Sequence, residues 1–143
     1  KKFDDPEAPF GQNTSRRDIV LSRLGETYLI AAEAYLQAGQ PGTGLNFLND
    51  VRERAGVVDA TLAEFDIDYI LDERGRELMG EYHRWFDLKR TGTLIERASA
   101  YHYLVEEGNF NGANGELKIL RPIPQSALDL NQNNDFEQNP AYQ

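Results

Sequence analysis

The chain of 143 residues contains no cysteine, one methionine and one tryptophan. The lack of cysteine excludes disulfides, thiolate metal ligands, thiol nucleophiles and lipid attachment to cysteine within these residues. No apolar run approaches the roughly 20 residues that a membrane-spanning helix needs. The chain opens KKFDDPEAPF, with neither an initiator methionine nor an apolar signal segment. We therefore interpret it as a processed protein or a fragment of a longer one.

Basic residues are also scarce. The chain has 15 Lys and Arg against 24 Asp and Glu, which gives a formal net charge of −9 at pH 7. Such a charge repels phosphate backbones and anionic lipid surfaces. The composition therefore argues against nucleic acid or an acidic membrane surface as a partner.

Helical periodicity dominates the pattern of apolar residues. Apolar side chains recur at three- and four-residue steps over 17–38, 45–55 and 67–90. The short turn GQPGTG separates the first two ranges, so they are expected to pair as an antiparallel hairpin. The stretch LGETY, at residues 24–28, is similar to the opening of a tetratricopeptide-type repeat.

The sequence thus predicts an all-α fold: a tetratricopeptide-like helical hairpin packed with a long charged helix, plus irregular loops and a C-terminal tail. Residues 1–16 are expected to be an irregular lead-in, and 17–143 the helical domain. Because a lone repeat cannot bury its apolar face, the third helix and further repeats outside this chain are expected to cover the hairpin.

The third predicted helix carries an unusual density of charge. Arg74 falls within its apolar stripe, between Leu71 and Leu78, and a buried guanidinium without a partner would be costly. Glu33, flanked by alanines on the first helix, and Glu77 are the expected partners of Arg74. The predicted lattice of structural ion pairs comprises Glu33, Arg74, Glu77, Glu81, Arg84 and Asp87.

Two chemical alternatives are weaker. Glu26, Glu33 and His83 could supply a glycosidase with acid and base, but seven helical residues separate the two carboxylates by about 10 Å, just beyond the separation that inverting enzymes use. No catalytic motif is present, so no catalytic residue and no cofactor are predicted.

A calcium site is the second alternative. Asp129, Asn131, Asn133 and Asp135 alternate like the first ligands of an EF-hand loop. The twelfth position is Pro140, where such a loop needs a bidentate glutamate, so no metal site is predicted.

Four motifs together resemble the C-terminal part of the SusD/RagB family: ERGREL (73–78), RWFDLKRTG (84–92), PIPQS (122–126) and QNPAY (138–142). The resemblance implies an α-helical, surface-exposed outer-membrane lipoprotein of Bacteroidetes-type bacteria. It also implies a non-catalytic protein that binds a glycan or another nutrient and works with a SusC-like, TonB-dependent transporter. Its lipid anchor would then lie upstream of this chain. The alternatives are a helical scaffold that contacts the transporter rather than sugar and, less favoured, a glycoside hydrolase.

Sugar rings stack on aromatic side chains because one side of a pyranose is lined by C–H groups. Trp85 falls on the apolar stripe of the charged helix and is interpreted as structural. Tyr101, His102, Tyr103 and Phe110 lie in and before the loop NFNGANG, where aromatics neighbour amides, and they are the candidate glycan contacts.

Overall fold

The computed structural model describes residues 5, 7, 17–132 and 136–143. Over these residues the fold is all-α, as predicted, and the sole strand-like pairing described is an isolated antiparallel bridge between Asn111 and Leu117. The chain forms two compact units, the first ending at Tyr82 and the second beginning at His83. All but two residues of the predicted lead-in 1–16 lie outside the described part, so its boundary stays a prediction.

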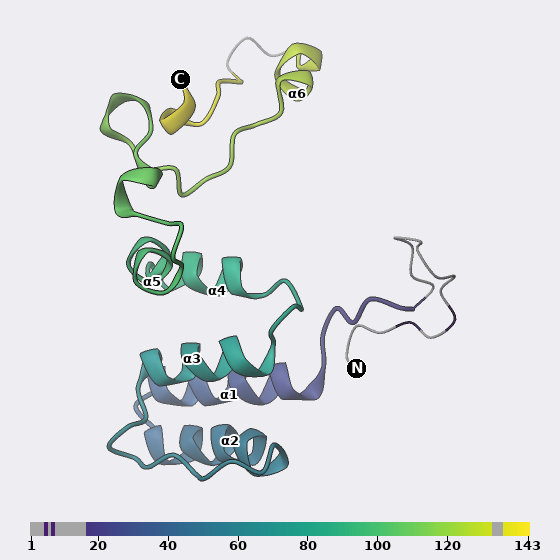
Figure 1. Ribbon diagram of the computed structural model, residues 1–143, viewed down its shortest axis with the longest axis vertical. Helices are drawn as coiled ribbons and strands as arrows, with labels where there is room; N and C mark the ends of the chain where they lie inside the picture. The colour runs from purple at the N-terminus through teal and green to yellow at the C-terminus, as the bar shows by residue number, and fades with distance from the viewer. Residues whose placement is uncertain (1–4, 6, 8–16, 133–135) are drawn as a thin grey trace. The chain divides into compact units, whose positions relative to one another are not determined.

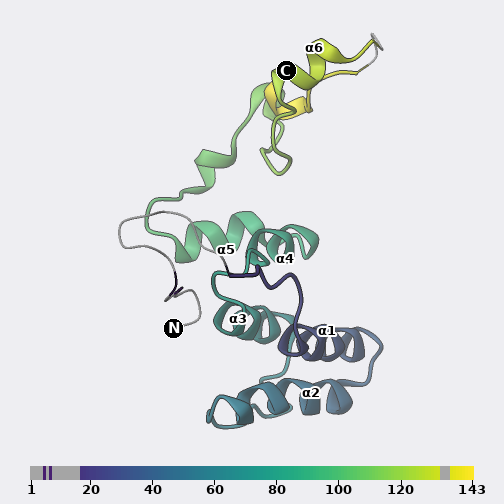
Figure 2. The same cartoon turned by 90° about the vertical axis from the view of Figure 1, so that its right-hand side faces the viewer.

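The first unit contains helices α1 (Leu24–Gln37), α2 (Pro41–Arg54) and α3 (Ile67–Glu77). Helix α1 packs against both other helices and lies between them (Figures 1 and 2). Gly39, with φ of 72°, allows the tight turn that reverses the chain between α1 and α2. The predicted hairpin and its cover by a third helix are therefore present, although α1 begins seven residues later and α2 four residues earlier than the sequence pattern predicted.

The core of this unit sits where α1, α2 and the start of α3 meet. Its buried members are Leu29, Ala32, Leu48, Val51, Ala60, Phe65 and Ile70. Phe47 adds an aromatic layer beside it, since its ring stacks on Tyr35 and meets Tyr28 edge-on, each at 5.5 Å between centroids. Aromatic pairs in these geometries add stability beyond the area they bury.

The connector from α2 to α3 runs back along the hairpin (Figure 1) and is held by polar side chains of its neighbours. The Asn49 amide donates to the Ala60 carbonyl at 3.1 Å and accepts from the Ala60 N–H at 2.9 Å. Asp66 then caps α3 by accepting from the Tyr69 N–H at 2.8 Å. These bonds place Ala60 and Phe65 in the core.

The prediction of one continuous helix over residues 67–90 is wrong. Helix α3 ends at Glu77, and α4 begins only at Arg84. Between them Gly80 and Tyr82 take left-handed backbone conformations, with φ of 78° and 66°. The reason lies partly outside the segment: the guanidinium of Arg23 binds the Glu77 carbonyl at 2.6 Å, a group that would accept from residue 81 in a continuing helix.

The break also ends the apolar stripe that was predicted along the segment. Ile70, Leu71 and Leu78 are buried, as a helix through α3 requires. Beyond the break, however, Tyr82 is 81% exposed and Phe86 is 68% exposed. Gly80 and Tyr82 interrupt the helical backbone. The rotation of 100° per residue that places side chains around α3 therefore does not continue to Tyr82 and Phe86.

Tyr82 gives a first testable prediction. A left-handed backbone costs an L-amino acid about 1 kcal/mol, and asparagine tolerates it better than tyrosine. Because the Tyr82 side chain is largely exposed, its loss removes little packing. We expect Tyr82→Asn to raise the free energy of unfolding by up to about 1 kcal/mol in urea titrations; a clear fall would show that the ring makes a stabilising contact.

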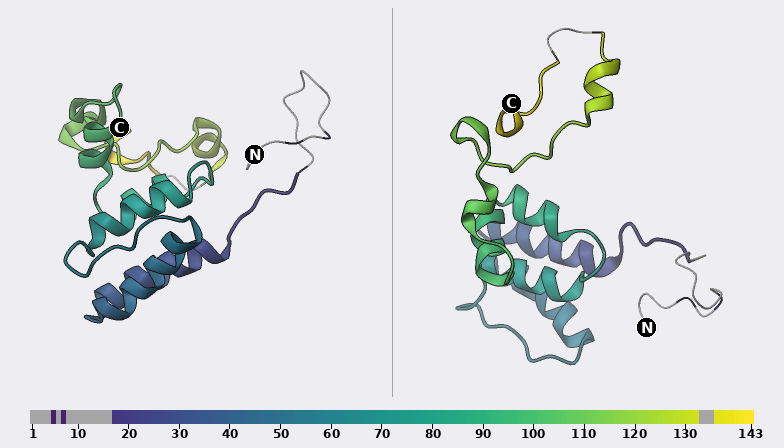
Figure 3. Two further views of the ribbon diagram at one scale, coloured as in Figure 1. Left: turned by 60° about the horizontal axis from the view of Figure 1, so that its bottom comes forward. Right: turned by 45° about the horizontal axis from the view of Figure 1, so that its top comes forward.

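The second unit contains α4 (Arg84–Arg90), α5 (Leu94–Tyr101), the short turns η1 (Glu107–Phe110) and η2 (Ala113–Gly115), α6 (Gln125–Leu130) and η3 (Pro140–Tyr142). Helix α6 is short, as predicted, whereas the predicted extended run over 117–124 is interrupted by a turn at 118–119 and a bend at Leu120. After α6 the chain folds back and η3 returns toward η2, with which it is in contact (Figure 3).

Candidate functional site

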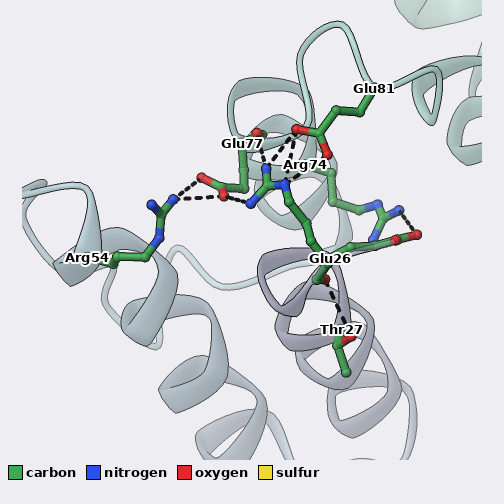
Figure 4. Close-up of polar contacts among 7 residues, drawn as sticks. Glu26, Thr27, Arg54, Arg74, Glu77 and Glu81 are labelled. Carbon is green, nitrogen blue, oxygen red and sulfur yellow. Dashed lines mark hydrogen bonds and ion pairs between the residues drawn. The ribbon is translucent and has the colours of Figure 1, made fainter. Parts of the chain in front are cut away.

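Two glutamates of the first unit bind one side chain, Arg23, which immediately precedes α1. Its guanidinium forms an ion pair with Glu77, donates to both carboxylate oxygens of Glu81 at 2.8 and 3.0 Å, and donates to the Glu77 carbonyl. Arg54 of α2 adds a second cation to Glu77, with both oxygens at 2.8 Å (Figure 4). The planar guanidinium of Arg23 thus links the start of α1 to the end of α3.

The two glutamates raise the pKa of Arg23, because they stabilise its charged form. The hydrogen bond to Glu81 raises the pKa of the guanidinium; burial opposes the shift, while the bond and charge of Glu77 add to it. Because a guanidinium is charged throughout the physiological pH range, Arg23 keeps its charge there and cannot serve as a base. The cluster acts as a permanent cross-link between elements.

Gly25 leaves room for this cross-link. A Cβ at position 25 would lie 2.7 Å from Arg23 Nη1 and 2.8 Å from Glu77 Oε1. The glycine of the LGETY stretch therefore allows the ion pair to pass close over the first turn of α1. This contact supplies a physical reason for glycine at that place in the repeat-like pattern.

Arg74 is buried, with 4% of the residue exposed, and its guanidinium lies 4.0 Å from a carboxylate oxygen of Glu26 on α1 (Figure 4). Glu33 is buried on the same helix. Glu26, which the glycosidase hypothesis would use as a catalyst, is thus the ion-pair partner of Arg74.

His83, the third residue of that hypothesis, belongs to the second unit, where its carbonyl accepts from the Asp87 N–H at 3.0 Å.

A second buried ion pair was not anticipated from the sequence. Arg52 of α2 binds Glu73 of α3 at 2.7 Å, and both side chains are almost entirely buried. The same guanidinium donates to the Val58 carbonyl at 2.6 and 2.9 Å and lies over the Tyr69 ring, 5.4 Å from its centroid. Arg76 joins the same glutamate at 2.8 Å. The periodic signal that could have found the pair is the position of Arg52 four residues after Leu48 and eight after Gly44, on the buried face of α2.

In the second unit, Asp87 of the RWFDLKRTG motif is buried and accepts from Arg90 at 3.1 Å. Arg84, the remaining member of the predicted lattice, is half-buried at the start of α4. Trp85 is half-buried, and the Arg121 guanidinium lies 5.2 Å from its ring centroid. That cation occupies one face of the indole, which agrees with a structural role for Trp85.

The closing QNPAY motif is hydrogen-bonded to the PIPQS motif. The amide of Gln138 pairs with the backbone of Ile123 through two bonds, as the backbone of a neighbouring strand would. The Gln138 amide accepts from the Ile123 N–H at 2.8 Å and donates to the Ile123 carbonyl at 2.9 Å. Asn139 donates to the Arg121 carbonyl at 2.6 Å. These side chains therefore satisfy the backbone of an extended segment that has no neighbouring strand among the described residues.

The aromatic candidates lie at the end of α5 and just beyond it. Tyr101 and Tyr103 are 75% and 91% exposed, and His102 is exposed between them. The rings of His102 and Tyr103 are stacked, with centroids 5.5 Å apart and planes 8° apart. Arg97 places its guanidinium 6.0 Å from the Tyr101 centroid. Phe110, at the end of η1, is half-buried, and no ring contact joins it to the others within the described residues.

The imidazole of His102 has a defined hydrogen-bonding role. Its Nδ1 accepts from the Leu104 N–H at 3.3 Å. In the neutral ring the hydrogen is then carried by Nε2, which is a donor. The segment therefore offers a flat aromatic surface beside a hydrogen-bond donor, a combination that suits a sugar.

The acidic and histidine side chains were also compared with the requirements of a metal site. Within the described residues, no group of three or more His, Cys, Asp or Glu side chains is placed to hold an ion. Two of the four calcium-like positions, Asn133 and Asp135, lie outside those residues. Likewise, no helix in the described ranges has both the length and the apolar character to cross a membrane.

Comparison of the sequence with known proteins identifies the family of the chain. The sequence model of the SusD family matches residues 1–142. The chain belongs to the SusD family. Its relatives include the SusD-like protein P25 of Formosa agariphila, 34% identical over 78% of this chain and 22% of that protein. The starch-binding protein SusD of Bacteroides thetaiotaomicron is 34% identical over 87% of the chain and 22% of its own length.

A third SusD-family relative, the SusD-like protein P2 of Formosa agariphila, is 31% identical over 90% of this chain and 26% of that protein. The chain thus spans about a fifth to a quarter of the length of these curated relatives. No solved structure matches it. The motifs that carry the family resemblance are the ones whose polar side chains form the ion pairs and amide bonds described above.

Proposed function

We propose that this chain is part of a surface glycan-binding protein without catalytic activity of its own. The observation that carries the proposal is the stacked pair of His102 and Tyr103, exposed and provided with a hydrogen-bond donor. Membership of the SusD family supports it, as does the printed name of one relative, a starch-binding protein. The ligand is a glycan or a related nutrient.

The same family membership supports a proposal for the setting in which the protein acts. The whole protein is proposed to sit at the outer membrane on the cell-surface side, held by a lipid anchor outside this chain. There it would present ligand to a SusC-like, TonB-dependent transporter. The ion-pair lattice, in which Arg74 binds Glu26 and Glu77 binds Arg23, holds the helices together and takes no part in chemistry.

The proposal is tested by Tyr103→Ala in the full-length protein. Affinity electrophoresis in gels that contain soluble starch, or another uncharged polysaccharide, first finds a ligand, and titration calorimetry then measures its affinity. One buried aromatic face is worth roughly 1.4 kcal/mol, so we expect the dissociation constant to rise about tenfold.

The matched control is Tyr82→Asn, which removes another largely exposed tyrosine that lies outside the aromatic segment. It should bind glycan like the wild type. If both variants bind normally, the glycan site lies elsewhere in the protein. If the wild type binds no glycan and copurifies with the transporter, the helical scaffold becomes the better account.

A further inference from the structure

Two asparagines of the loop NFNGANG are each followed by glycine, in the pairs Asn111–Gly112 and Asn114–Gly115. An asparagine in this setting can react with its own backbone: the amide nitrogen of the next residue attacks the side-chain Cγ, a cyclic succinimide forms and ammonia leaves. Water then opens the ring to aspartate or isoaspartate. Glycine favours the attack, because it has no side chain to hinder its nitrogen and its backbone rotates readily. The two pairs are equivalent in sequence, so only the structure distinguishes them.

The first pair, Asn111–Gly112, is held on both sides. Asn111 forms the isolated antiparallel bridge with Leu117, and the Gly112 N–H donates to the Glu116 carbonyl at 2.9 Å. The nitrogen that would attack Asn111 is therefore engaged in a backbone hydrogen bond. Gly112 also packs against η3, since a Cβ at position 112 would lie 2.6 Å from the Ala141 Cβ. The reaction at Asn111 thus requires a local opening that breaks these contacts.

The second pair, Asn114–Gly115, forms the tip of the same loop. Both residues are exposed, and both have a left-handed backbone, with φ of 56° and 78°. A Cβ at Gly115 would meet no atom within 4 Å. The Asn114 amide has no hydrogen-bond partner in the part of the chain that the structure describes. The rotation that brings the Gly115 nitrogen to the Asn114 Cγ therefore breaks none of the contacts that hold the first pair.

From this contrast we propose that Asn114 is a site of spontaneous deamidation and that the fold protects Asn111. Each event consumes one solvent water and releases one ammonia, with no change of oxidation state. Aspartate adds one negative charge to the loop. Isoaspartate also adds one carbon to the main chain between Ala113 and Glu116, whose backbones are joined by a hydrogen bond of 3.0 Å. It should therefore open the turn η2, which contacts η3 of the closing QNPAY motif.

The full-length protein is incubated in mildly alkaline buffer, where the backbone nitrogen loses its proton more readily. Peptide mapping by mass spectrometry then follows the exchange of a side-chain NH₂ for OH, and fragment ions assign it to Asn111 or Asn114. We expect deamidation to be at least about tenfold faster at Asn114. Asn114→Gln should nearly abolish the modification of this loop, because a glutamine would have to close a larger, less favourable ring. The matched variant Asn111→Gln should leave the rate at Asn114 unchanged.

Unfolding in guanidinium chloride separates the effect of the fold from that of the sequence. In the unfolded chain the protection of Asn111 is lost, so the two rates should agree within about twofold. Equal rates in the folded protein overturn the proposal, and so does a folded protein in which neither pair reacts. A preference for Asn114 that is equally large in the unfolded chain also overturns it, because the selectivity would then come from the sequence. None of these outcomes depends on whether the protein binds a glycan.

Discussion

Replacing Gly44 with alanine should destabilise the helical hairpin by about 1–3 kcal/mol, the usual range for overfilling a packed interior. Gly44 lies in α2 where it meets α1, and a Cβ there would sit 2.6 Å from the Ala32 carbonyl oxygen and 3.0 Å from the Phe65 ring. The first of these is backbone, which cannot move without displacing α1. The cost should therefore exceed the gain of up to about 1 kcal/mol that alanine brings to a helix.

Gly42→Ala is the matched control, two residues earlier in the same helix. A Cβ at Gly42 meets no atom within 4 Å. The same substitution should here leave stability unchanged or raise it by up to about 1 kcal/mol. Urea denaturation of both variants, followed by circular dichroism, gives the comparison. Equal effects at the two positions would contradict the close approach of α1 and α2.

The largest loss is expected for Arg52→Met, which leaves the buried carboxylate of Glu73 without its partner at 2.7 Å. Breaking a buried ion pair from one side costs about 3–5 kcal/mol, because the remaining charge stays out of water. The exposed Arg76 still reaches Glu73 and should keep the loss near the lower end. The variant also frees the Val58 carbonyl, so the connector before α3 should exchange its amide hydrogens faster.

Arg54→Met separates this effect from a general effect of charge. Arg54 lies on the same helix and also binds a glutamate of α3, but its side chain is 62% exposed. Exposed pairs contribute about 0–1 kcal/mol. Calorimetric melting of the two variants should therefore show a large fall in midpoint for Arg52→Met and a small one for Arg54→Met. A small fall for both would mean that the Arg52–Glu73 pair is solvated.

The helices of the hairpin were predictable because their apolar residues repeat at a constant step, which reports packing directly. The break between α3 and α4 was not, because part of its cause is a contact from a distant position. Periodicity in 67–90 contains no information about Arg23, whose guanidinium takes the last carbonyl of α3. Gly80 was the sole local hint, and glycine also occurs inside helices.

For the charged residues, burial could be predicted from the sequence, but most of the pairs between helices could not. The structure buries Arg74, as the sequence predicted, and places it 4.0 Å from Glu26, whereas the sequence had indicated Glu33 and Glu77 as its partners. The sequence did not indicate Arg23, Arg52 and Arg54 as partners of the α3 glutamates, because pairs between helices depend on their relative rotation. The aromatic candidates could be chosen from composition, but the stacking of His102 on Tyr103 could not, since it requires side-chain rotamers.

Under the proposed function, the charged residues of α1 and α3 hold the helices together and carry out no reaction. The most direct test is reducing-end release from a polysaccharide that the purified full-length protein binds. We expect no release above the buffer blank over many hours, in the wild type and in Glu26→Gln alike. Steady release by the wild type that disappears in a folded Glu26→Gln variant would contradict the account and make the protein a hydrolase.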